Sequence, residues 1–433
     1  MSFHAKTIRN DFPILRQSSQ DRPLIYLDSA ATTQKPQQVI DALVRYYTQH
    51  NANVGRGVYS LSLVADGVYE RARMTMQRFV NAKHPGEIVF TRSTTDAVNI
   101  VARSYAEETL REGDEILVSA MEHHGNLCPW QVACARTGAR IRVAPLDARG
   151  DLDLDAFRSL LTERTKLVAI THVSNVLGTV NPLRAIIAEA HRHGIPVFAD
   201  GAQAVAHMPI DVQDLDCDFY CFSGHKMYGP MGIGVLYAKE AILDRMPPYQ
   251  TGGGMAFNVT FQEITQWKSA PHKFEAGTPN VEGAVGLEAA AKYLTGLGLE
   301  RIGAHEAEIL RYATDRLREI ESLSIHGDAR IKAPLISFLV GDIHPLDIGN
   351  YLDEFGVAVR TGDHCTMPLV DLLALPVGTV RASFGVYTTK SDIDVLCRAV
   401  AAAKAACSTP HAAPARGEPL APLVATGTSG GKS

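Results

Sequence analysis

Apolar residues in the first two thirds of the chain form short continuous runs, and the segments between them carry apolar residues at every third or fourth position. Short runs are typical of buried strands, and the wider spacing is typical of amphipathic helices. The expected strands lie at 87–90, 115–118, 166–171, 195–200, 218–222 and 233–237. Apolar strands that alternate with helices indicate a mostly parallel sheet covered on both faces. We therefore predict an α/β fold for this region.

The pattern changes at about residue 271, where helical spacing begins to dominate. Helices are expected at 284–298, 303–319 and 391–407, and strands at 335–340 and 357–360. This change predicts a second, smaller α+β domain. The expected organisation is an N-terminal arm (1–20) that packs on the small domain, a large domain (21–270), the small domain (271–407) and a tail (408–433). The tail is rich in Ala, Pro, Gly, Ser and Thr and has no apolar period, which predicts disorder.

Composition and charge narrow the classes of function. The chain has 433 residues, 46% of them hydrophobic, and a formal net charge of −5, with no basic surplus for nucleic acid. No apolar stretch approaches the roughly 20 residues of a membrane span, and the N-terminus lacks the apolar region of a secretory signal. The seven cysteines are scattered, which fits a reducing cytoplasm, and no second pair is spaced for zinc. We expect a cytoplasmic protein without a metal, nucleic-acid or membrane partner.

Unusual polar residues follow several of the predicted strands. In open parallel sheets, ligands bind at the carboxyl ends of the strands. Polar residues at these ends are Ser93 to Thr95, Glu122 to His124, His172 to Asn175, Asp200, and Ser223 to Lys226. Their common placement predicts a single site.

Lys226 and Asp200 together suggest the chemistry of that site. A lysine just past a buried strand is partly desolvated, which lowers its pKa and frees the amine to form a Schiff base. Asp200 could keep a pyridine nitrogen protonated, and the ring would then act as an electron sink. Gln203 could reach the phenolic oxygen of such a ring. Alone, the lysine could be a surface charge and the aspartate a helix N-cap. The pair favours a pyridoxal-phosphate site.

A phosphate anchor is expected at the helix that begins near Thr94 and Thr95, because unpaired backbone N–H groups at a helix start favour anions. Ser223 and His225 would add donors from a neighbouring loop. Simple N-capping is the alternative for the threonines. His123 could stack on the ring and transfer protons, since imidazole titrates near neutral pH. A polar surface role is the alternative for this histidine.

Three further residues are candidates in the C-terminal part of the chain. Cys365 lies in a predicted loop between Arg360 and Pro368, where a thiolate could act as a nucleophile. An incidental free cysteine is the alternative. Arg381 could present its planar guanidinium to a carboxylate or serve a structural partner. Thr278 could offer its hydroxyl to a phosphate.

Taken together, these motifs resemble a known family. The segments that carry the resemblance are 171–179 (THVSNVLGT), 200–203 (DGAQ), 222–230 (FSGHKMYGP) and 360–368 (RTGDHCTMP). From about residue 26 to 406 the chain resembles the class V aminotransferases, which are fold type I PLP enzymes, and within them the SufS-type (group II) cysteine desulfurases. The resemblance implies a large domain with a mostly parallel sheet covered by helices and a smaller α+β C-terminal domain.

The resemblance also implies a role for each candidate residue. Lys226 would be the Schiff-base lysine and Cys365 the persulfide carrier, while His123 would be the stacked acid/base residue. The remaining roles are ring partners (Asp200, Gln203), phosphate ligands (Thr95, Ser223, His225, with Thr278 from the other subunit of a homodimer) and substrate-carboxylate ligands (Asn175, Arg381, with Arg360 adjacent).

The implied reaction converts L-cysteine to L-alanine and leaves the sulfur on Cys365 as a persulfide. A SufE-like or SufU-like acceptor would then carry the sulfur toward iron–sulfur cluster assembly. SufU-partnered relatives tend to have a histidine where Leu346 stands, which favours a SufE-like acceptor. A selenocysteine lyase, acting on L-selenocysteine, would share every motif. A non-catalytic docking subunit of the same fold or a plain aminotransferase would share most of them, but neither would need Cys365.

Two positions depart from the family pattern. Asp363 stands where the family usually has the first histidine of a His-His-Cys sequence. A carboxylate two residues from the thiol is expected to disfavour its thiolate form unless Arg360 or His364 offsets it. Gly55 stands where SufS-type enzymes commonly have a histidine. We expect both changes to affect the rate of the reaction and not its type.

Overall fold

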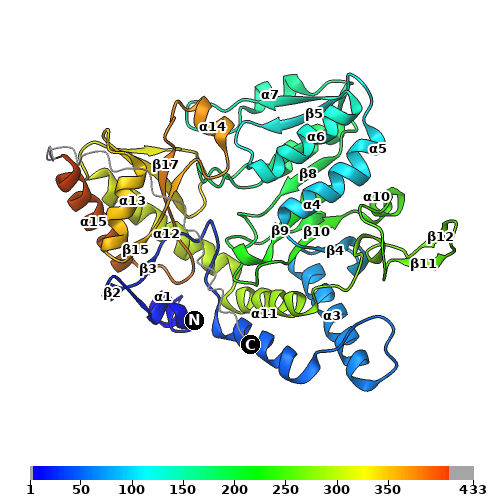
Figure 1. The fold of residues 1–433 in the computed structure, drawn as a ribbon. Helices are drawn as coiled ribbons and strands as arrows, with labels where there is room; N and C mark the ends of the chain where they lie inside the picture. The colour runs from blue at the N-terminus through cyan, green and yellow to red at the C-terminus, as the bar shows by residue number, and fades with distance from the viewer. Residues whose placement is uncertain (1–2, 409–433) are drawn as a thin grey trace, which may run out of the picture.

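The computed structural model of the chain, which describes residues 3–408, is built around a seven-stranded sheet (Figure 1). The strand order is β4-β10-β9-β8-β7-β5-β6. The strands are β4 (Ile88–Thr91), β5 (Glu115–Ser119), β6 (Arg140–Ala144), β7 (Thr165–Thr171), β8 (Val197–Asp200), β9 (Phe219–Ser223) and β10 (Gly234–Ala238). Strands β5 to β9 pair in parallel, and β10 is antiparallel to both of its neighbours. The predicted mostly parallel sheet is therefore confirmed.

Helices cover both faces of this sheet, as strand β9 illustrates. Phe219 and Cys221 pack in one apolar cluster with residues of α4 (Thr94–Val101) and α6 (Cys128–Thr137). Tyr220 and Phe222 pack in the opposite cluster, with residues of α3 (Ser60–Phe79), α8 (Leu183–Arg192) and α11 (Val281–Leu297). Successive side chains of a strand point to opposite faces, so a strand that is apolar throughout needs cover on both.

The C-terminal domain contains a second sheet, which is antiparallel and has the order β13-β14-β17-β16. Its strands are β13 (Leu323–His326), β14 (Leu335–Val340), β16 (Arg360–Gly362) and β17 (Thr379–Ser383). Helices α12 (Leu299–Arg318), α13 (Pro345–Glu354) and α15 (Lys390–Ser408) supply apolar residues to its core, on the left of Figure 1. The predicted helices at 284–298, 303–319 and 391–407 correspond to α11, α12 and α15.

The N-terminal residues join these two sheets. Phe12 is fully buried against the rings of Tyr228, Tyr293 and Tyr387. Strand β3 (Ile25–Tyr26) pairs in parallel with β15 (Val357–Ala358). This pairing explains why the predicted strand 357–360 is divided in two: β15 pairs with β3, whereas β16 turns to pair with β17.

Shorter elements complete the fold. They are α1 (Ala5–Arg9), η1 (Pro13–Arg16), β1 (Ser18–Ser19), β2 (Arg22–Pro23), α2 (Gln37–Arg45), η2 (Tyr46–His50), η3 (Pro85–Glu87), η4 (Ala102–Ala106), α5 (Glu107–Thr109), η5 (His124–Asn126), α7 (Leu154–Leu160), α9 (Val212–Leu215), η6 (Gly224–Lys226), α10 (Glu240–Arg245), β11 (Ala256–Val259), β12 (Ile264–Trp267), η7 (His272–Phe274) and α14 (Met367–Leu372).

The apolar pattern did not predict every strand of the fold, and β13 and β17 of the second sheet are among those it missed. Strand β6 was not predicted, because its arginines interrupt the apolar run that marks a buried strand. The β11–β12 hairpin, which projects at the right of Figure 1, was not predicted either. Apart from Ser408, the predicted disordered tail lies outside the described residues. Within residues 3–408, no helix combines the length and the apolar character that a membrane crossing requires.

Candidate active site

A cavity of about 360 Å³ lies at the carboxyl ends of β7, β8 and β9. It gathers every predicted site residue except Thr278. The predicted residues in its wall are Thr94, Thr95, His123, Asn175, Asp200, Gln203, Ser223, His225, Lys226, Arg360, Cys365 and Arg381. Arg360, Cys365 and Arg381 belong to the C-terminal part of the chain, so the cavity is shared between the two sheets. The polar residues expected at the strand ends therefore lie together in one cavity.

Lys226 ends the short helical turn η6 directly after β9. Within the described part of the chain, its ammonium makes no hydrogen bond and no ion pair, although the side chain lines the cavity. Burial lowers the pKa of Lys226, and the negative charge of Asp200 opposes this shift. Asp200 is buried at the end of β8, where its Oδ1 accepts the Ala202 N–H at 2.9 Å. The cavity thus holds an unpartnered amine beside a buried carboxylate.

The first turn of α4 forms another part of the wall. The Thr94 N–H donates to Ser223 Oγ at 2.8 Å, and the two hydroxyls are also 2.8 Å apart. Ser93 caps the helix by accepting the Asp96 N–H. Because Ser93 performs the capping, Thr94 and Thr95 are not needed for it. His225 completes this region, where burial lowers the pKa of its imidazole to about 4. These groups can offer neutral donors to an anion.

His123 lies on the adjacent wall. Its Nδ1 accepts the Gly125 N–H at 2.9 Å, which leaves the proton on Nε2. Burial lowers the pKa of His123 to about 3, and the positive charge of Lys226 adds to this effect. The ring is therefore neutral near pH 7. A Cβ on Gly125 would come within 2.9 Å of Thr95 Oγ1 and 3.1 Å of His123 Nδ1, so these two walls meet closely.

Two arginines from the second sheet converge on Asp28. Arg360 Nη2 lies 2.8 Å from Asp28 Oδ2, and Arg381 Nη2 lies 3.4 Å from Asp28 Oδ1. Arg381 Nη1 also donates to the backbone oxygen of Asn175 at 2.9 Å. The Nε of Arg381 is buried without a partner in the described residues, and burial lowers the pKa of this guanidinium to about 10. An unsatisfied buried donor of this kind suits a substrate carboxylate.

Asp28 was missed as a site residue by reasoning from the sequence. It lies two residues after the start of the region that resembles the class V aminotransferases, and no motif was assigned to it. Its position two residues after the short strand β3 was the available signal, but that strand pairs with a segment more than three hundred residues away. The link to Arg381 therefore cannot be seen in the local sequence.

Cys365 is exposed at the mouth of the cavity. Its charge as a thiolate would raise the pKa of Lys226 and of Arg381, which line the same cavity. The Asn175 Nδ2 group donates to the His364 backbone oxygen at 2.8 Å, which ties the loop to the strand ends. The thiol is thus placed within the electrostatic reach of the amine and the guanidinium.

Asp363 has a structural contact as well as a charge. Its Oδ1 accepts the backbone N–H of Cys365 at 3.3 Å. The carboxylate therefore supports the turn that presents the thiol.

Gly55, the other departure from the family pattern, has φ +98° and lies in a different cavity of about 560 Å³. Thr278 lines that second cavity too. Its expected role in the site of another subunit stays a prediction.

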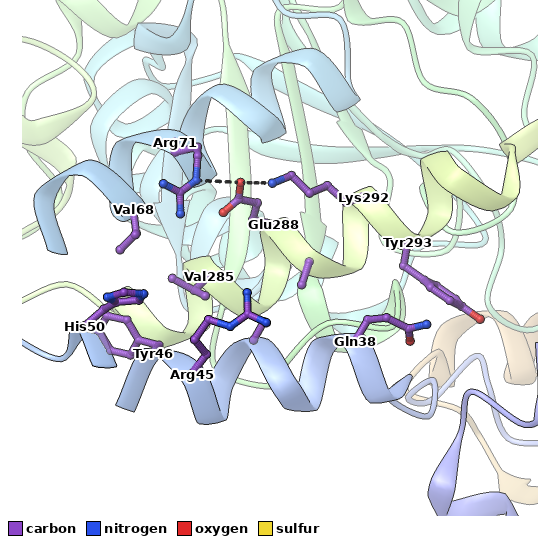
Figure 2. A pocket seen from close by; sticks show the side chains of 12 residues that line it. Gln38, Arg45, Tyr46, His50, Val68, Arg71, Val285, Glu288, Lys292 and Tyr293 are labelled. Atoms are coloured by element: carbon purple, nitrogen blue, oxygen red, sulfur yellow. Dashed lines mark hydrogen bonds and ion pairs between the residues drawn. The ribbon is translucent and has the colours of Figure 1, made fainter. Parts of the chain in front are cut away.

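A third cavity, of about 470 Å³, lies between α2, α3 and α11 (Figure 2). Two of its cations are already paired: Arg71 Nε and Lys292 Nζ lie 3.3 and 2.6 Å from the same oxygen of Glu288. The cavity contains none of the predicted site residues. We therefore assign the candidate active site to the cavity that holds Lys226.

Comparison with known proteins agrees with this architecture. Residues 25–396 match the family model described as aminotransferase class-V. A cysteine desulfurase of Salmonella dublin is 49% identical over 396 residues, which are 92% of this chain and 97% of the relative. The chain therefore belongs to the aminotransferase class-V family and, within it, to the family of cysteine desulfurases.

Solved structures show the same relationship. The cysteine desulfurase CsdA from Escherichia coli has a TM-score of 0.86 and 40% identity, and the match covers 93% of this chain and 99% of that one. A cysteine desulfurase from Thermococcus onnurineus has a TM-score of 0.88 and 35% identity, with coverage of 94% and 100%. The predicted family and its α/β, fold type I architecture are confirmed.

Proposed function

We propose that this protein is a PLP-dependent cysteine desulfurase, which converts L-cysteine to L-alanine and takes up the sulfur on Cys365. The observation that carries the proposal is the composition of one cavity. It combines an unpartnered Lys226 amine, the buried Asp200 carboxylate, an unsatisfied Arg381 donor and an exposed cysteine thiol. Relatives at 49% identity with this activity support it.

The residues of the cavity fit pyridoxal phosphate. Lys226 would hold the cofactor through its amine, and Asp200 would hold the ring nitrogen in its charged form. Thr94, Thr95, Ser223 and His225 would bind the phosphate with neutral donors. Gln203, whose Nε2 donates to the Ala30 oxygen at 2.7 Å, would face the phenolic oxygen. When bound, PLP supplies an electron sink for negative charge that develops at the substrate Cα.

The remaining residues would bind and orient the substrate. Arg381 would receive the carboxylate of L-cysteine through its planar guanidinium, with Asn175 beside it. Arg360 and Arg381 share Asp28, so Asp28 would hold both guanidinium groups in place and Arg360 would add positive charge. This arrangement would direct the substrate Cα toward Lys226 and its sulfur toward the mouth of the cavity, where Cys365 lies.

Proton and sulfur transfer follow from the same placement. The Lys226 amine, with its pKa lowered by burial, can accept the Cα proton. His123 carries its proton on Nε2 and can pass protons within the cavity. The Cys365 thiolate would bond to the substrate sulfur while the substrate Cβ–S bond breaks. The electron pair of that bond would stay on Cβ, which would take a proton to become the methyl group of alanine. Alanine would then leave, and the persulfide would remain on the exposed side of the site.

The partners proposed for this enzyme are a second copy of the chain and a sulfur acceptor. A group of exposed apolar side chains supports a homodimer. They lie on α2, η2 and α3 and in the segment just before α3, and they include Val44, Tyr47, Val58, Tyr59, Leu61, Leu63 and Val64. The exposure of Cys365 supports transfer to the thiol of a SufE-like or SufU-like protein for iron–sulfur cluster assembly. We place this activity in the cytoplasm.

The test is a multiple-turnover assay with L-cysteine and a reductant, in which alanine is measured and added sulfur is located by mass spectrometry. Cys365→Ser should abolish turnover and the sulfur adduct, because no thiol is left to accept the sulfur. Cys407→Ser, at the exposed end of α15, is the matched control and should behave like the wild type. Full turnover by Cys365→Ser would refute the proposed mechanism.

A further inference from the structure

The loop that carries Cys365 has an unusual backbone. His364 and Cys365 have φ values of +52° and +59°, in the left-handed region. For residues with a Cβ, this conformation is unfavourable, and it persists only where the surroundings impose it. Two such residues in succession therefore need specific contacts to hold them.

Part of this support lies within the loop itself. The backbone oxygen of Asp363 accepts the N–H of Thr366 at 3.0 Å and its hydroxyl at 2.7 Å. The Asp363 side chain accepts the Cys365 N–H. These contacts close the turn, but they do not determine where the turn sits relative to the large sheet. That position must come from residues elsewhere in the chain.

His124 makes two such contacts, one with Cys365 itself and one two residues further along the chain. Its backbone N–H donates to the Cys365 oxygen at 2.8 Å. Its Nε2 accepts the Met367 N–H at 3.1 Å. His124 opens the η5 turn beyond β5 and directly follows His123, which lines the cavity. One residue thus joins the thiol loop to the wall of the site.

The two neighbouring histidines accept hydrogen bonds with different ring nitrogens. His123 accepts a backbone N–H with Nδ1, so its Nε2 keeps the proton. His124 accepts with Nε2, so its proton is on Nδ1. We propose that His124 is a positioning residue for sulfur transfer, whose imidazole and backbone N–H together hold the Cys365 thiol at the mouth of the cavity. This inference rests on the proposed function, because it requires Cys365 to receive the sulfur.

Other contacts also hold the Cys365 loop, and they limit the expected effect of replacing His124. Asn175 holds the His364 oxygen, and Leu369 of α14 packs with Met121 and Val176. Loss of the His124 imidazole removes one hydrogen bond from this set. A single hydrogen bond is worth about 1 kcal/mol, which corresponds to roughly a fivefold change in an equilibrium or rate.

The experiment compares His124→Leu with His124→Gln in the holoenzyme. Glutamine can place Oε1 near the position of Nε2 and keep an acceptor for the Met367 N–H, whereas leucine cannot. For His124→Leu we expect faster hydrogen exchange in a peptide covering 363–367 and a kcat about fivefold lower. The KM for L-cysteine and the visible absorbance of the cofactor should be unchanged, because Arg381 and Lys226 are untouched. His124→Gln should restore both exchange and kcat.

Wild-type exchange and kcat in His124→Leu would overturn the inference, and so would a failure of His124→Gln to restore them. If His124→Leu does not fold, His124→Asn replaces it, because its shorter amide cannot reach Met367; the same two outcomes apply. Failure of the proposed function looks different. In that case Cys365→Ser would retain multiple turnover, whatever the His124 variants do.

Discussion

The two halves of the candidate site are built in different ways. Lys226, Asp200 and Ser223 stand at the ends of adjacent strands, so the hydrogen bonds of the sheet hold them in place. Cys365 stands on an exposed loop with left-handed backbone, held by a few contacts to residues that lie far away in the sequence. The strand-end half is therefore held by many backbone hydrogen bonds. The position of the loop half depends on single hydrogen bonds, so changes of about 1 kcal/mol can alter it.

The largest difference between the halves should come from Lys226→Ala. We expect the yellow colour of the bound cofactor to be lost and turnover to fall by about a thousandfold or more, because both the tether and the base are removed. Visible absorbance and alanine release measure the two effects. Lys390→Ala, which removes an exposed lysine paired with Glu308, should leave both unchanged. An unchanged spectrum in Lys226→Ala would contradict the cofactor assignment.

The buried half should also control the dependence of stability on pH. Glu122 accepts hydrogen bonds from Ser119, Asn126 and the Thr171 N–H, yet burial raises its pKa from 4.5 to about 7. A raised folded-state pKa means that the native state binds the proton more tightly than the unfolded state does. The stability from this group is present below about pH 4.5 and is lost as the pH rises through about 7.

Between about pH 4.5 and pH 7, the free energy of unfolding of the wild type should therefore fall by roughly 3 kcal/mol more than that of Glu122→Gln. Urea unfolding at several pH values gives the difference from the wild type. Glu321→Gln, on the exposed surface, is the control. A difference curve for Glu122→Gln that is as flat as that of the control would show that the carboxyl does not titrate in this range.

A smaller effect is expected at the boundary between the halves. Arg381→Lys loses the planar guanidinium and its bond to the Asn175 oxygen. We expect the KM for L-cysteine to rise by about thirtyfold, which corresponds to about 2 kcal/mol for a charged hydrogen bond. Arg360→Lys should raise KM less, since Arg360 is about half exposed and its charge is screened. Equal effects of the two changes would mean that Arg381 is not the main carboxylate ligand.

The smallest effect is expected within the loop. Asp363→Asn removes the charge near the thiol but retains a side-chain oxygen for the Cys365 N–H. The rate of Cys365 alkylation by iodoacetamide at pH 7 should rise by no more than about fivefold, as for other exposed charge pairs. Asp363→Ala, which also loses the acceptor, separates charge from support of the turn. A slower reaction in Asp363→Asn would show that the carboxylate does not disfavour the thiolate.

Sequence reasoning identified the buried half of the site more completely than the loop half. Every strand that ends at the cavity was visible as an apolar run, and the polar residues after those runs were recognised. Asp28 and the role of His124 were not recognised from the sequence. Their contacts are to Arg381 and Met367, and no local pattern reports such distant pairs. The β6 strand was missed because its polar residues face outward at the edge of the sheet.

The sequence by itself determined the main alternation of strands and helices in the large sheet, the family, and the residues at the strand ends, because apolar periodicity and motif spacing are local properties of the chain. Only the tertiary structure decided that Arg360, Cys365 and Arg381 join Lys226 in one cavity, that Asp28 lies between the two arginines, and that Thr278 lies elsewhere. These placements depend on how the second sheet and the N-terminal strand pack against the first sheet. Such packing is set by contacts between residues that are hundreds of positions apart.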